Sequence, residues 1–178
     1  MKKQLSNIIA SAHYYLGAFL FHSGCARIHQ RVHEFSMREL QRSADLGMGK
    51  AQLLFGQLLK YRGATDFNKI AGIRYLRESA EKGSIDALFM LAEALQDKSL
   101  IEFTAPEAMG VTDAAHKQNS RLDLSDPVML YLAAAKAGHV MAALRLSKIY
   151  QQGSLGQVID SEQAEYWRSE FMEQGKKH

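Results

Sequence analysis

The sequence has few of the residues that interrupt helices or cross-link chains. Its 178 residues include two prolines, Pro106 and Pro127, and one cysteine, Cys25. Because proline lacks a backbone N–H and clashes inside a helix, its scarcity is typical of a largely helical chain. A single cysteine excludes a disulfide within the chain, and we expect an ordinary buried or half-buried thiol.

Charge of one sign is not in excess, and long apolar runs are missing. The chain has 22 Lys and Arg against 19 Asp and Glu, a net charge of +3. This mild, evenly spread charge does not indicate a nucleic-acid partner. No stretch has the ~20 uninterrupted apolar residues that a membrane span needs. With 47% apolar residues, the chain is too hydrophobic for disorder, and we expect one domain over 1–178.

The first 25 residues carry a faint likeness to an export signal. Lys2 and Lys3 precede an apolar stretch, and Ser23-Gly24-Cys25 is similar to a lipoprotein cleavage site. However, residues 11–13 (Ser-Ala-His) interrupt the apolar run. We therefore favour a retained first helix and a cytoplasmic protein, with an exported or periplasmic protein as the alternative.

What the chain does contain is a repeated step, Gly-x-x-x-Ala, at residues 47–51, 83–87 and 138–142. Each Ala is followed by an apolar residue four positions on, a small residue five positions on and an apolar residue eight positions on. Ala12 begins a copy without the glycine. The three glycines and Gly175 are separated by 36, 55 and 37 residues. A period of this size predicts stacked helix pairs.

Each position of the step has a physical role. Glycine just past a helix end adopts the left-handed conformation that a β-carbon opposes. The apolar positions lie on one face of the following helix, and the small residues allow close helix approach. We therefore expect Ala51, Ala87 and Ala142 to be buried where helices touch.

These residues resemble the Sel1-like repeat family, which is related to tetratricopeptide repeats. The family's first-helix motif is seen as Ala12-x-x-x-Leu16-Gly17 and Ala51-x-x-x-Phe55-Gly56, and its second-helix motif as Ala164-Glu-Tyr-Trp167 followed by Gly175. The family's G-x-G-V-x-x-D loop is missing. The resemblance implies an all-α fold: an α/α solenoid (right-handed superhelix) of about four helix-turn-helix repeats, at about 8–47, 48–83, 84–138 and 139–175.

Helix signals agree with this division. The pattern predicts helices over 4–23, 32–46, 51–61, 67–82, 85–96, 127–137, 140–152 and 161–174. The predicted N-caps are Asp66, Asp126 and Asp160, the last with Gln163 reaching back in a capping box. The third repeat carries an insertion, 97–126, that makes its spacing 19 residues longer than that of the second. It is either a solvated loop or a binding element beside the groove.

One feature of the first repeat leaves an alternative open. Tyr14, Tyr15, Phe19 and Phe21 form an aromatic cluster that is either core or an exposed patch for a partner. On its inner face, the second predicted helix should bury Phe35, Leu40 and Ala44.

The resemblance implies a binding scaffold and carries over no catalytic residue. The sequence shows no nucleophile motif, phosphate-binding loop or paired carboxylates. We therefore expect a non-enzymatic adaptor without a cofactor, which binds a protein or peptide in bacterial signalling, host contact or toxin neutralisation. In this family the first helices line the concave surface. The corresponding groove residues are Phe21, His22, Gln57, Lys60, Tyr61, Glu93, Gln96, Lys148 and Gln151.

A metal-dependent enzyme or sensor is the alternative function. Cys25, His29 and His33 are spaced by four residues, so on a helix they would share a face and could bind zinc or another soft divalent metal. The competing interpretation is a polar loop between helices that is rich in histidine.

Overall fold

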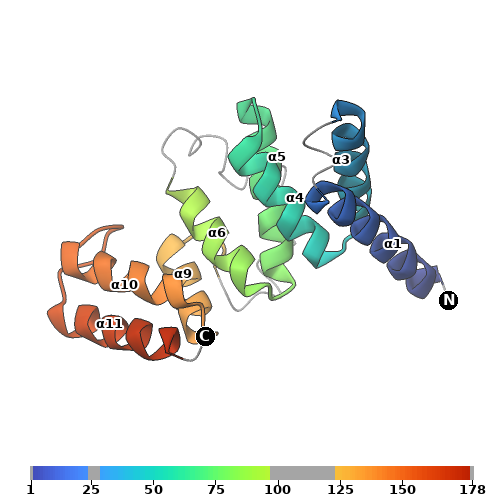
Figure 1. Cartoon of the computed structure of the whole chain (residues 1–178). Coiled ribbons are helices and arrows are strands. Elements are labelled where there is room, and N and C mark those ends of the chain that lie inside the picture. Colours follow the sequence, from blue (N-terminus) through green and yellow to red (C-terminus); the bar gives the residue numbers. More distant parts are fainter. Residues whose placement is uncertain (1, 24–28, 97–122, 177–178) are drawn as a thin grey trace. The chain divides into compact units, whose positions relative to one another are not determined.

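The computed structural model describes residues 2–23, 29–96 and 123–176, in which every regular element is an α-helix (Figure 1). Cys25 and residues 97–122 of the insertion lie outside the described part. The chain divides into two compact units, Met1–Ser84 and Ile85–His178.

The first unit consists of two helix pairs. Its helices are α1 (Lys2–His22), α3 (Gln30–Asp45), α4 (Gly49–Arg62) and α5 (Asp66–Glu81). Helix α1 packs against α3, α4 packs against α5, and α3 also contacts α4. Two successive pairs are therefore stacked through the second helix of one and the first helix of the next.

The second unit repeats this plan. Its helices are α6 (Ile85–Leu95), α9 (Pro127–Lys136), α10 (Val140–Gln152) and α11 (Ser161–Gly175). Helix α6 packs against α9 and α10 against α11, while α9 contacts α10. The prediction of an all-α chain built from four helix pairs is confirmed for the described residues.

The repeated glycines join one pair to the next through the same local geometry. Gly47, Gly83 and Gly138 have φ values of 85°, 84° and 94°. In each joint the glycine N–H donates to the carbonyl three residues back, at 2.9 Å. The following N–H donates to the carbonyl five residues back, at 3.0–3.2 Å. This pattern is the Schellman motif, so the predicted role of the glycines is confirmed.

The residues of the repeated step form the core. Ala51, Ala87 and Ala142 are fully buried, as predicted. The residues four positions after them are buried as well: Phe55, Leu91 and Leu146. Burial of these positions is the main stabilising contribution to each pair, since an isolated amphipathic helix is marginal in water.

Small residues bring the paired helices close together. A Cβ built on Gly72 of α5 would lie 2.7 Å from the backbone oxygen of Gly56 and 2.7 Å from the backbone nitrogen of Lys60, both on α4. In the first pair, the buried Ser36 hydroxyl donates to the carbonyl of Gly17 at 2.9 Å. Glycine is therefore required where these helices cross.

Some local predictions were wrong. The N-cap of α5 is Thr65, whose hydroxyl accepts from the N–H of Asn68, and Asp66 is the first helical residue. Phe35 is 39% exposed rather than buried, whereas Leu40 and Ala44 are fully buried as expected.

The two other predicted caps are present. Asp126 accepts from the N–H of Val128, and Asp160 accepts from the N–H of Gln163. The reciprocal half of the capping box does not form, because the Asp160 N–H donates to the carbonyl of Tyr150 at 3.0 Å.

Candidate functional site

In the first unit, the predicted groove residues lie near the C-terminal ends of the first helices, α1 and α4. The side chains of Phe21 and His33 contact each other, with ring centroids 6.1 Å apart. The Arg62 guanidinium carbon lies 5.7 Å from the centroid of the Phe21 ring, within the range of a cation–π contact. Phe21 therefore brings the end of α4 to the end of α1.

The other predicted residues of this unit lie on the same two helices, His22 on α1 and the rest on α4. His22 and Tyr61 are exposed, Tyr61 to 60%, while Gln57 and Lys60 are half-buried. We call Phe21, His22, Lys60, Tyr61 and Arg62 the basic–aromatic cluster. It contains cationic and aromatic side chains, a combination suited to an acidic or aromatic peptide segment.

In the second unit, Glu93 and Gln96 are engaged by other side chains of the chain. The Tyr131 hydroxyl of α9 donates to Glu93 at 2.6 Å, and Gln96 donates to the Tyr131 hydroxyl. Arg145 of α10 donates to Glu93 from Nε at 2.8 Å and from Nη2 at 2.9 Å. A partner that bound Glu93 would therefore compete with a bidentate ion pair.

Two buried tyrosine hydroxyls have raised pKa values. Burial, followed by the hydrogen bond to Glu93, raises the pKa of the Tyr131 hydroxyl. In the first unit, burial and the hydrogen bond to Asp45 raise the pKa of Tyr75 to about 12. Both phenols consequently remain protonated donors to their carboxylates at neutral pH.

Lys148 and Gln151 lie on the exposed side of α10. Gln151 contributes to a small surface pocket of about 190 Å³ between α10 and α11. The other lining residues are Ser147, Ser161, Ala164, Glu165 and Arg168. The pocket is smaller than a typical small-molecule site and could hold at most one side chain of a partner.

A polar network lies beneath the first joint, and no sequence pattern predicted it. Gln52 is buried, donates to the Ala44 carbonyl at 3.2 Å, and accepts from Lys82 at 2.6 Å. Lys82 also donates to the carbonyl of Gly47 at 2.7 Å. The amide donates to Glu78, whose pKa is raised mainly by burial. The contacts of Gln52 with Glu78 and of Lys82 with Gly47 and Gln52 join residues 26 to 35 positions apart, so no local sequence pattern predicts them.

His139 has a similarly unpredicted setting at the start of α10. Its Nδ1 accepts from the Ala142 N–H at 3.2 Å, and its ring stacks on Phe89 at 4.3 Å. Burial lowers the pKa of His139, although Asp86 opposes the shift. The neutral imidazole is the form that caps the helix, because a protonated Nδ1 has no lone pair to accept with.

The metal hypothesis receives little support from the described residues. His29 and His33 are exposed, and among the residues that the structure describes no group of three His, Cys, Asp or Glu is placed to hold a metal ion. Cys25, the third proposed ligand, lies outside them.

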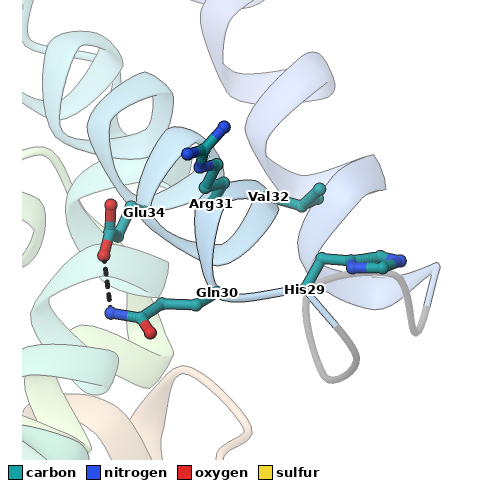
Figure 2. Close-up of a pocket in the computed structure, with 5 residues that line it drawn as sticks. All are labelled: His29, Gln30, Arg31, Val32 and Glu34. Atoms are coloured by element: carbon teal, nitrogen blue, oxygen red, sulfur yellow. Dashed lines mark hydrogen bonds between the residues drawn. The ribbon is translucent and has the colours of Figure 1, made fainter.

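The start of α3 lines a surface depression of about 670 Å³ (Figure 2). Gln30 donates to Glu34 at 2.9 Å there, while His29 and Val32 point away from this pair. The lining side chains do not converge on one point, as a small-molecule site requires.

Solved structures with the same arrangement of helices identify the architecture. The chain is similar to a Sel1 repeat protein from Oxalobacter formigenes, with a TM-score of 0.61 and 20% identity, over 92% of this chain and 58% of that one. It matches a protective antigen with an SLR fold, found in uropathogenic Escherichia coli strains, with a TM-score of 0.67 and 21% identity.

This chain has the Sel1-like repeat fold. The second match covers 93% of this chain but 31% of the antigen, so the chain spans less than two thirds of either solved protein. No protein-family model and no curated protein matches the sequence. Among its described helices, the chain has none that is long and apolar enough to cross a membrane.

Proposed function

We propose that the chain is a non-enzymatic scaffold that binds a protein or peptide along the C-terminal ends of its first helices. The observation that carries the proposal is the basic–aromatic cluster, in which Tyr61 is 60% exposed beside Lys60 and Arg62. Exposed tyrosine and arginine are the side chains that contribute most to binding at protein interfaces.

The Sel1-like repeat fold supports this function by its construction. Within each unit, stacked helix pairs place the ends of successive first helices beside one another, and repeat proteins use such surfaces for extended partners. Taken by itself, the second unit would offer a partner polar contacts from Glu93, Gln96, Lys148 and Gln151. A role in bacterial signalling, host contact or toxin neutralisation is consistent with a scaffold of this kind.

The test begins with recovery of partners from a lysate of the native organism on the immobilised chain. Captured proteins are identified by mass spectrometry and their affinities measured with purified components. The double variant Lys60→Glu with Tyr61→Ala should lower the affinity at least tenfold, because it removes an aromatic anchor and reverses a charge.

A matched control removes the same side-chain types from another helix. Phe67→Ala with Lys69→Glu changes an aromatic residue that is 78% exposed and a lysine that pairs with Asp66 in an exposed contact on α5. This control should bind as the wild type does. Equal binding by both double variants would remove the cluster from the binding surface.

A further inference from the structure

Helix α1 carries an exposed apolar face, separate from the proposed binding surface. Leu5, Ile8, Ile9, Tyr15, Leu16 and Phe19 are between 42% and 70% exposed, and Ala12 is exposed among them. We call these seven residues the α1 stripe. Their spacing of three, four and seven residues places them on one side of the helix. Tyr14 and Phe21, in contrast, pack against the core cluster of the first unit.

The repeat shows what this face is built to contact. Ala12 and Leu16 occupy the same positions of the repeated step as Ala51 and Phe55 of α4, which are buried. The element that covers α4 is α3, the second helix of the preceding pair, whose Leu40 and Ala44 belong to one cluster with Ala51 and Phe55. The α1 stripe is therefore a helix-binding face, and no described helix covers it.

The α1 stripe is symmetric about Ala12, and this symmetry indicates that the helix that covers it is α1 of a second copy. Its members lie three, four and seven positions on either side of Ala12. A two-fold axis through Ala12 would pair Leu5 with Phe19, Ile8 with Leu16 and Ile9 with Tyr15 of a second copy. The smallest side chain would lie on the axis, where two helices approach most closely. Such self-complementarity is what a two-fold interface requires.

Charge favours the same antiparallel arrangement. Between Gln4 and Phe21, α1 contains no Asp, Glu, Lys or Arg, so self-pairing buries no like charges. Antiparallel helices place Lys3 near the C-terminal end of the other α1, where the helix dipole is negative. Parallel helices would instead bring the two Lys3 residues together.

We propose that the α1 stripe pairs with the α1 stripe of a second copy of this chain, antiparallel about Ala12. With about 200 Å² for a large side chain, the exposed fractions amount to roughly 700 Å² per copy. Complete burial on both copies would therefore remove on the order of 1,400 Å² from water, toward the lower end of the range for a specific interface. For a small interface built from one helix of each copy, we expect a weak dimer of micromolar affinity.

The experiment uses the whole 178-residue chain with its tag at the C-terminus and with Cys25→Ser, so that introduced thiols are the only ones. Under mild oxidation, Ala12→Cys should form a disulfide-linked dimer efficiently. Leu5→Cys and Phe19→Cys should each cross-link poorly alone and efficiently when mixed. Asn7→Cys, which is exposed on a different side of α1, is the control and should not cross-link.

Sedimentation equilibrium at tens of micromolar should give twice the monomer mass for the wild type. Phe19→Glu, at the most exposed stripe position, should weaken the dimer at least tenfold without changing the circular dichroism spectrum. A wild-type monomer would overturn the proposal. Cross-linking of Leu5→Cys with itself would indicate parallel helices and overturn it too. Flotation of a monomeric chain with phosphatidylglycerol vesicles would assign the stripe to a lipid surface instead.

Discussion

The crossing of α4 and α5 gives a sharp test of the packing, through the substitution Gly72→Ala. Alanine favours a helix over glycine by about 1 kcal/mol, so propensity alone predicts a more stable protein. The new methyl group, however, would lie 2.7 Å from two backbone atoms of α4, which cannot move aside as a flexible side chain would. The two effects thus have opposite signs.

Overpacking a closed interface costs about 1–3 kcal/mol, and two backbone clashes justify the upper end of that range. The net loss of unfolding free energy should then be about 2 kcal/mol. For a chain of this size, that corresponds to a melting temperature lower by about 4–8 °C. Thermal unfolding followed by circular dichroism at 222 nm measures it.

Gly49→Ala is the matched control. Gly49 is also helical and has a φ outside the left-handed range, and its added Cβ would meet only the flexible side chain of Lys82, at 3.7 Å. Its melting temperature should equal or slightly exceed that of the wild type. A Gly72→Ala protein as stable as this control would refute the close crossing of α4 and α5.

Three further predictions concern a titrating cap, a corrected cap and the insertion. Because burial lowers the pKa of His139, the unfolded chain binds a proton more readily than the folded one, so stability should decline as pH falls through 6.5. His139→Asn keeps a capping side chain but does not titrate. In urea titrations, this variant should therefore lose less unfolding free energy than the wild type between pH 7.5 and 5. Equal losses in the two proteins would exclude this cap. Thr65→Ala should cost about 1 kcal/mol, and Asp66→Ala less; the reverse order in denaturant melts would restore Asp66 as the cap. Deleting 101–119 should leave helicity nearly unchanged, since closing a longer loop costs about 1 kcal/mol or less, while weakening partner binding; an unfolded product would make this segment structural.

The joints and core were predictable because their causes are local. A Schellman glycine needs a left-handed residue, and only glycine adopts that conformation without cost. The buried alanine then follows at a fixed distance, so Gly47 and Ala51 identify one another. Asp126 was equally readable, because Asp followed by Pro is suited to only one place in a helix.

Other features depend on contacts that a single helix does not encode. Thr65 and Asp66 are both able to cap, and backbone direction decided between them. Glu93 matched a groove position by spacing, but its bonds to Tyr131 and Arg145 join residues 38 and 52 positions apart. The exposure of Leu16 could not be read either, since its repeat position is buried wherever another helix lies over it.

The Schellman joints also divide the connections of this chain into two classes. The links between pairs, 46–48, 82–84 and 137–139, each have three residues. The two within-pair links that the structure describes in full, 63–65 and 153–160, differ in length. One residue added to a joint would turn the apolar face of the next helix by about 100°, away from its neighbour. The length of a within-pair link does not set the rotation of the next helix in this way. The joints thus fix the phase of successive helices, so we expect an inserted residue to be tolerated better between the two helices of a pair than at a joint.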